Sequence, residues 1–357
     1  MCACGPTALQ SGAMTLKLGL QAGYWSAGPP AGIVEQIRTA EELGFESLWT
    51  AEAYGSDALT PLAWWGAATT TIKLGTAIMQ MSARTPTAVA MAAMTLDHLS
   101  GGRMIVGIGA SGPQVVEGWY GQPYPKPLER TREYVHILRA VWAREKPVEF
   151  SGNQYTLPYP GGAGLGKPLK STVHPLRADI PVYLGAEGPK NVALAAELCD
   201  GWLPLFFSPR QDAFYRQCLN EGFSRPGAHT TMATFDVAAG ATVIIDPDVE
   251  AAADKIRPML ALYMGGMGAR GQNFHFDVFS RMGYEDVAVK VQDLYLDGKK
   301  DEAIASIPTA LCEEVALIGP ADKIRDDLAM WDESCITTLL LSGPPSQLRA
   351  VAEIVRG

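Results

Sequence analysis

The sequence predicts an α/β fold, a TIM-type (β/α)8 barrel with insertions after its fourth and seventh strands. From residue 14 onward, short β-type runs alternate with longer helical patterns, which is typical of parallel strands joined by crossover helices. Eight strand signals occur in this order, the number that closes such a barrel. The chain of 357 residues with 47% hydrophobic content can bury a core of that size. The predicted strands cover residues 16–22, 45–50, 72–78, 104–108, 181–185, 201–204, 235–245 and 336–341.

The helices between these strands are predicted from apolar periodicity and from their end signals. The first spans 33–43, where Ile33, Ile37 and Leu43 share one face and Gly44 ends the helix. Helices beginning at Pro86 and Pro189 use a proline in the first turn, where the missing N–H costs nothing. The remaining predicted helices cover 61–70, 128–144, 209–221 and 347–355.

Two regions are too long for a single crossover. After strand four come a Gly/Pro-rich connection at 109–127, a helix, a predicted hairpin at 148–159 and a glycine-rich segment at 161–166. After strand seven an α-rich stretch runs from 249 to about 304. We expect 1–13 to be a disordered extension and 14–357 to be one domain.

Composition restricts the functional classes. The net charge of −9 without a long acidic run argues against a nucleic-acid partner, and charged residues and prolines interrupt the apolar stretches, which argues against a membrane span. Neither the six scattered cysteines nor the five histidines have metal-ligand spacing. We therefore expect a cytoplasmic protein that acts on a small molecule and holds no metal.

The most informative motif is the run Gly107-Ile-Gly109-Ala-Ser-Gly112, which follows a predicted strand and matches G-x-G-x-x-G. As a dinucleotide fingerprint it would need a long helix at its third glycine and an acidic residue about twenty positions later, at a strand end. Gly118 and the prolines after it break such a helix early. The motif is better explained as the loop above barrel strand four, where backbone approaches a ligand closely.

The segment Gly161-Gly-Ala-Gly-Leu-Gly166-Lys167 resembles a phosphate loop, but Pro168 replaces the Ser or Thr that would hold magnesium and no helix follows. We interpret it either as a wall beside the barrel mouth or as a plain surface loop.

Further candidates lie where other strands end, since the chemistry of such barrels sits at the carboxyl ends of the strands. After strand five, Ala186-Glu-Gly-Pro-Lys-Asn191 opens a helix whose free N–H groups suit an anion, although an ordinary helix start explains it equally well. After strand two, Glu52 would be either a proton carrier or a salt-bridge partner. The insertion after strand seven brings the segment 263–275 to the same face.

With these residues placed, the chain resembles the luciferase-like superfamily over about residues 15–355, and within it the actinobacterial coenzyme F420-dependent oxidoreductases. The resemblance is carried by Leu-Gly-Thr-Ala-Ile-Met at 74–79, Thr-Leu-Asp-His-Leu-Ser-Gly-Gly-Arg at 95–103, the glycine motif at 107–114, Ala-Glu-Gly-Pro at 186–189 and Asp-Gly-Trp at 200–202.

This resemblance implies that the cofactor, coenzyme F420 or alternatively FMN, lies against strand three, where Ala77-Ile78 would be a non-prolyl cis peptide. Lys190 and Asn191 would contact its phosphate-bearing tail. The implied cofactor-binding residues are Thr76, Ala77, Ile78, Met79, Ser111, Gly112, Glu187, Gly188, Pro189, Lys190 and Asn191.

One departure concerns catalysis. Sugar-phosphate and alcohol dehydrogenases of the superfamily carry an Asp-His pair after strand two, where this chain has Ala51-Glu52-Ala53-Tyr54. Glu52 would replace the acidic member, and Tyr54 is the candidate proton donor. The expected reaction is hydride transfer between the deazaflavin C5 and a small organic substrate.

The substrate is expected to be apolar, because several aromatic residues fall in predicted mouth loops. Two alternatives remain: a monooxygenase that uses reduced FMN and oxygen, and a barrel that binds a ligand without catalysis. The superfamily also implies a homodimer or larger homo-oligomer. The aromatic residues in question are Trp25, Trp64, Trp65, Trp119, Tyr120 and Tyr124.

Overall fold

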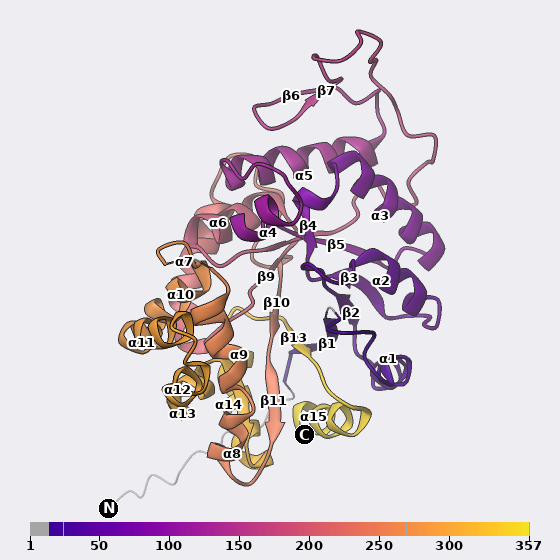
Figure 1. Cartoon of the computed structure of the whole chain (residues 1–357). Helices are drawn as coiled ribbons and strands as arrows, with labels where there is room; N and C mark the ends of the chain where they lie inside the picture. Colours follow the sequence, from indigo (N-terminus) through magenta and orange to yellow (C-terminus); the bar gives the residue numbers. More distant parts are fainter. Residues whose placement is uncertain (1–13, 24, 269, 357) are drawn as a thin grey trace, which may run out of the picture.

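The computed structural model describes residues 14–356 apart from 24 and 269, so the extension predicted at 1–13 lies outside the described residues. Eight parallel strand positions form a closed barrel, because β1 pairs with both β2 and β13 while β3 pairs with β5 (Figure 1). The predicted barrel fold is confirmed. Its strands are β1 (Lys17–Gly23), β2 (Ser47–Thr50), β3 (Lys73–Thr76) continued by β4 (Met79–Gln80), β5 (Met104–Gly109), β8 (Val182–Gly185), β9 (Gly201–Leu203), β10 (Asp236–Gly240) and β13 (Thr338–Leu341).

Side chains fill the inside of the barrel. Trp49 and Tyr183 project into it with ring centroids 5.4 Å apart, and Ile105 and Leu340 pack beside them. Gly75 is required at this level, because a Cβ there would lie 2.4 Å from the Trp49 ring. The interior is a packed core rather than a pore, so a ligand has room only at a barrel end.

A ring of crossover helices covers the outside of the barrel, and α15 packs against α1 to complete it (Figure 1). The apolar residues between strands and helices form the largest hydrophobic cluster of the molecule. The crossover helices are α1 (Ile33–Glu42), α2 (Leu59–Gly66), α3 (Pro86–Ser100), α5 (Pro127–Ala143), α6 (Pro189–Leu198), α7 (Asp212–Phe223), α14 (Ala321–Glu333) and α15 (Pro345–Arg356).

The connection between β5 and β8 carries extra structure around α5. A short helix, α4 (Pro113–Gly118), lies in the part expected to be a loop, and the hairpin β6 (Phe150–Ser151) and β7 (Thr156–Leu157) projects beyond α5 (Figure 1). The Glu133 carboxylate accepts the main-chain N–H groups of 153–155 at 2.8–2.9 Å, which fixes the hairpin turn. The glycine-rich segment after it is exposed, with Lys167 on the surface.

The connection between β10 and β13 differs from the sequence prediction. The single strand expected at 235–245 is wrong, because the chain leaves the barrel after Gly240. The next strand, β11 (Thr242–Ile245), pairs in parallel with β12 (Ala316–Gly319), which was not predicted, and neither pairs with the barrel. The helices between β11 and β12 pack on a second hydrophobic core, which also includes Phe206 from the segment after β9. They are α8 (Val249–Asp254), α9 (Arg257–Ala261), η3 (Leu262–Gly266), α10 (Phe274–Phe279), η4 (Ser280–Tyr284), α11 (Glu285–Leu296), α12 (Lys300–Ala305) and α13 (Thr309–Val315).

Within the described part of the chain, none of the helices is both long enough and apolar enough to cross a membrane.

Candidate active site

A cavity of about 920 Å³ opens at the carboxyl ends of the barrel strands. Its walls come from the segments after β2, β5, β8 and β9, from the β3–β4 junction and from the insertion that contains α10. Nine of the thirteen predicted site residues line it, and the other four do not. The lining residues are Glu52, Tyr54, Ala77, Ile78, Ser111, Gly112, Glu187, Gly188 and Asn191.

Thr76, Met79, Pro189 and Lys190 stand outside the cavity lining for two different reasons. Thr76 and Met79 are fully buried in the wall. The Thr76 hydroxyl donates to the Gly107 carbonyl at 2.8 Å and accepts the Gly107 N–H at 3.0 Å, so this side chain joins β3 to β5. Pro189 and Lys190 are exposed at the start of α6.

The floor of the cavity is the junction between β3 and β4. The peptide bond between Ala77 and Ile78 is cis, as the resemblance implied. The Ile78 side chain fits between two glycines, because a Cβ would lie 2.6 Å from it at Gly109 and 2.9 Å from it at Gly185. The shape of the floor therefore depends on glycine at both positions.

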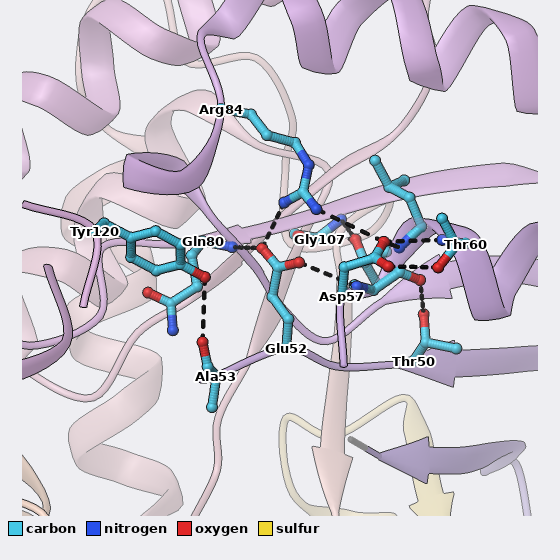
Figure 2. A network of polar contacts seen from close by, with 12 residues as sticks. Thr50, Glu52, Ala53, Asp57, Thr60, Gln80, Arg84, Gly107 and Tyr120 are labelled. Atoms are coloured by element: carbon cyan, nitrogen blue, oxygen red, sulfur yellow. Dashed lines mark hydrogen bonds and ion pairs between the residues drawn. The ribbon is translucent and has the colours of Figure 1, made fainter. Parts of the chain in front are cut away.

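A network of polar contacts holds the loop after β2 against this floor (Figure 2). The Glu52 carboxylate is buried, and its Oε1 accepts the Gln80 N–H at 2.7 Å and the Arg84 Nη1–H at 2.6 Å. Its Oε2 accepts the Ala58 N–H at 3.0 Å. The Glu52 main-chain N–H donates to the Ile78 carbonyl at 3.2 Å. Both carboxylate oxygens thus have donors, which is the geometry of the salt-bridge alternative.

The same network extends to both ends of the loop. Figure 2 shows Arg84 between Glu52 and Asp57, with Arg84 Nη2 3.7 Å from Asp57 Oδ1. Burial raises the pKa of Asp57, but hydrogen bonds from Thr60 and Leu59 and the Arg84 charge outweigh this and lower it below its usual value. The Tyr120 hydroxyl donates to the Ala53 carbonyl at 3.1 Å. Tyr54, between these contacts, is 59% exposed at the cavity rim.

The wall formed after β8 differs from this loop, because only one oxygen of its buried carboxyl group has a hydrogen-bond donor in the described part of the chain. The Glu187 Oε1 accepts the Leu205 N–H at 2.8 Å, whereas Oε2 is buried without a hydrogen-bond partner among the described residues. Arg281 Nη2 donates to the Glu187 main-chain carbonyl at 2.8 Å. Burial raises the pKa of Glu187 to about 8, and the Leu205 hydrogen bond and the Arg281 charge offset this only in part. The carboxyl group is therefore mainly neutral at pH 7.

Like Glu187 Oε2, three other buried polar atoms of the cavity lining have no hydrogen-bond partner among the described residues. They are Gln80 Oε1, Asn191 Oδ1 and His275 Nδ1. Buried polar atoms are nearly always paired, so a group of four around one cavity indicates that a polar ligand supplies their partners.

The loop after β5 presents main chain to the cavity, as its glycine motif predicted. Ser111 adopts φ 59°, and its carbonyl accepts the Tyr124 hydroxyl at 2.6 Å. Gly112 precedes Pro113 at the start of α4. Of the six aromatic residues expected at the mouth, Trp119 and Tyr124 line the cavity, whereas Trp64 is exposed on α2.

His275 lies in the cavity wall but was not singled out from the sequence. The only signal was its place in the insertion after strand seven, which was expected at this face. Lys167, in contrast, lies outside the cavity lining, which favours the surface-loop interpretation of its glycine-rich segment. No group of three His, Cys, Asp or Glu side chains within the described ranges is arranged to hold a metal ion.

The fold and the cavity define a (β/α)8-barrel protein with a ligand site at the carboxyl ends of its strands. The family model for luciferase-like monooxygenases matches residues 12–338, so the chain belongs to the luciferase-like family.

Among its relatives is Rv3520c of Mycobacterium tuberculosis, provisionally named a coenzyme F420-dependent oxidoreductase. It is 56% identical over 343 residues, which cover 95% of this chain and 99% of Rv3520c. A 5,10-methylenetetrahydromethanopterin reductase of Archaeoglobus fulgidus is 28% identical, covering 86% of this chain and 88% of the reductase.

Two solved structures share the fold at lower identity. The coenzyme F420-dependent tetrahydromethanopterin reductase of Methanopyrus kandleri superposes with a TM-score of 0.77 at 22% identity, covering 95% of this chain and 97% of that one. An F420-dependent secondary alcohol dehydrogenase with a bound F420-acetone adduct superposes with a TM-score of 0.75 at 20% identity, covering 96% of this chain and 100% of that one.

Proposed function

We propose that this protein is a coenzyme F420-dependent oxidoreductase that transfers a hydride between the deazaflavin and a small, largely apolar substrate. The observation that carries the proposal is the cavity at the β3–β4 junction, with four buried and unpartnered polar atoms in its lining. The 56% identity to Rv3520c over nearly the whole chain supports the choice of cofactor.

The donor set of the cavity fits a deazaflavin. Such a ring presents carbonyl oxygens and an N–H along one edge, and the amide oxygens of Gln80 and Asn191 can accept from an N–H. A protonated Glu187 can donate to a carbonyl. Ala77 and Ile78 would support the ring, and Ser111, Gly112 and Gly188 would contact the ring or ribityl chain through their main chain. When bound, the deazaflavin would supply hydride transfer at C5.

The start of α6 is the proposed site for the phosphate of the cofactor tail. The first turn has no acidic residue, and no side chain caps it. Its N-terminal partial positive charge and the exposed Lys190 ammonium both favour an anion. Pro189 shapes this turn rather than contacting the cavity.

Glu52 and Tyr54 remain the proposed catalytic pair, with separate tasks. Because donors occupy both oxygens of Glu52, we assign it the task of fixing the loop that carries Tyr54. Tyr54 at the rim is the proposed proton donor. Thr76 and Met79 would act indirectly, by shaping the wall behind the ring.

Titration of the purified protein with oxidised coenzyme F420 and, in parallel, with FMN tests the proposal. We expect saturable changes in deazaflavin fluorescence and visible absorbance. The proposal fails if FMN binds under conditions in which the deazaflavin signals stay unchanged. Oxygen consumption that depends on supplied reduced FMN would identify a monooxygenase, and cofactor binding without turnover over a broad substrate panel would identify a binding protein.

We further propose that residues from 14 onward form one domain that associates with itself in the cytoplasm. Trp64, Met91 and Leu99 are 79%, 61% and 78% exposed on α2 and α3, and such apolar exposure favours association. Cys199, Cys218, Cys312 and Cys335 are free thiols, which suits a reducing compartment. Light scattering coupled to size exclusion measures the oligomeric state, and a single cooperative unfolding transition would support one domain.

A further inference from the structure

His275 is a buried side chain with an unpartnered ring nitrogen. The residue is 6% exposed, and its Nδ1 is buried without a hydrogen-bond partner among the described residues. The ring lies in the first turn of α10 and in the lining of the cavity. Because burial removes water from the imidazole, a ligand is the remaining source of a partner.

The surroundings of the imidazole are aromatic. Its ring centroid lies 4.3 Å from that of Phe274, 4.9 Å from Tyr263 and 5.9 Å from Phe206. Burial alone lowers the pKa of His275 to about 4, so the ring is neutral at neutral pH. A neutral imidazole has one N–H donor and one acceptor nitrogen, so it can pair with a hydroxyl or with a carbonyl.

The insertion holds the imidazole in a fixed position. Asn273 Oδ1 accepts the His275 N–H at 3.0 Å and the Phe276 N–H at 3.2 Å, which caps α10. Asn273 Nδ2 donates to the carbonyls of Tyr263 and Met264 at 2.8 and 2.9 Å, which ties α10 to the preceding turn.

That turn is itself closely packed. A Cβ at Gly265 would lie 2.4 Å from the Tyr295 Cβ, and one at Gly268 would lie 2.8 Å from the Asn273 Cβ. The position of His275 is therefore built into the insertion, as a binding group requires.

We propose that His275 anchors the polar group of the substrate, and that the substrate is a largely apolar molecule carrying a hydroxyl or carbonyl group. Tyr263 and Phe274, which line the cavity beside the imidazole, would contact the apolar body, and the imidazole would fix its orientation. The assignment to substrate rests on the proposed function, because there the deazaflavin occupies the side of the cavity formed by the β3–β4 junction and Glu187.

The test uses benzyl alcohol and toluene, two probes of similar size that differ in one hydroxyl group. Binding to the full chain without cofactor is followed by NMR with ¹³C-labelled histidine, and the His275→Phe variant identifies the His275 signal. We expect benzyl alcohol to shift this signal saturably and toluene to leave it nearly unchanged. His275→Phe should weaken benzyl alcohol binding about fivefold relative to toluene, the effect of one hydrogen bond.

Two variants serve as controls. His275→Gln keeps a hydrogen-bonding group and should retain most of the preference for benzyl alcohol. His136→Phe changes an exposed histidine on α5, outside the cavity lining, and should behave like the unmodified protein.

Three results would overturn the proposal: equal effects of the two probes on the unmodified protein, no effect of either probe, or loss of deazaflavin binding in His275→Phe. The last would assign His275 to the cofactor. Failure of the unmodified protein to bind deazaflavin would contradict the proposed function alone, because both probes are measured without cofactor.

Discussion

Two walls of the same cavity differ in whether their buried polar atoms have hydrogen-bond partners within the protein. On the loop after β2, both oxygens of the Glu52 carboxylate accept hydrogen bonds. On the wall formed after β8, Glu187 Oε2 is buried without a partner among the described residues, as is His275 Nδ1 on α10. A buried group that is satisfied within the protein stabilises the shape of the site, whereas one that is not satisfied favours ligand binding. Substitutions on the two walls should therefore affect different measurements.

The largest effect is expected from Glu52→Gln. The change removes the ion pair with Arg84. It also replaces one carboxylate oxygen by an NH2 group, which cannot accept a hydrogen bond, so one main-chain N–H loses its acceptor. We expect the free energy of unfolding to fall by about 3 kcal/mol. Chemical denaturation measures this difference.

Glu46→Gln is the matched control for that prediction. Glu46 pairs with Lys73 at 3.4 Å, but both side chains are about half exposed. An exposed pair of this kind contributes less than about 1 kcal/mol. Similar losses in the two variants would show that the Glu52 network does not hold the loop.

Glu187→Gln tests the other wall through pH. Its pKa is raised from 4.5 to about 8 in the folded protein, so between these values the folded chain binds more protons than the unfolded chain. The stability from this group is therefore complete below about pH 4.5 and is lost as pH rises through 8. The slope is about 1.4 kcal/mol per pH unit, or about 2 kcal/mol between about pH 6 and pH 7.5.

Denaturation of the two proteins at both pH values isolates this contribution. Glu187→Gln should lose correspondingly less stability over that interval, since its amide does not titrate. Parallel pH dependences would mean that Glu187 is ionised in the folded state.

Glycine substitutions compare a packed part of the cavity with an open part. Gly109→Ala places a methyl group 2.6 Å from the Ile78 side chain, and we expect a loss of about 1–3 kcal/mol. Gly188→Ala meets no described atom within 4 Å, so its stability should change by less than about 0.5 kcal/mol. Because Gly188 lines the cavity, its added methyl should instead weaken deazaflavin binding. A stable Gly109→Ala would argue against the tight floor.

The smallest effect is expected from Lys190→Gln. The side chain is exposed at the start of α6, so the substitution should leave stability unchanged and weaken deazaflavin binding only severalfold. Repeating the titration at high salt should remove the difference, because salt screens an exposed charge. A difference that persists at high salt would contradict a purely electrostatic role.

The sequence predicted what local patterns determine. Helix α6 begins at Pro189 as predicted, because a proline suits the first turn of a helix. The split between β10 and β11 was missed because the apolar run continues past Gly240, and β11 finds its partner β12 more than seventy residues later. Such a pairing leaves no local signal in a single sequence.

The site, too, depends on contacts between residues far apart in the sequence, which the sequence alone did not predict. Its glycine loop and the cis peptide were anticipated, but the Arg84 partner of Glu52 lies 32 positions away and depends on the assembled barrel. The Thr76 hydroxyl turns into the wall toward Gly107, a choice that the alternation of a strand does not reveal. His275 becomes notable only when its aromatic neighbours and its unpartnered ring nitrogen are seen.

The pairing of β11 with β12 has a consequence for divergence. The chain enters and leaves the segment between them on adjacent strands outside the barrel, so its attachment does not depend on barrel register. Changes in the length or composition of that segment can therefore alter the surroundings of His275 while the barrel and the β3–β4 floor stay intact. The fold thus allows the insertion to vary in sequence and length separately from the strands that form the floor of the cavity.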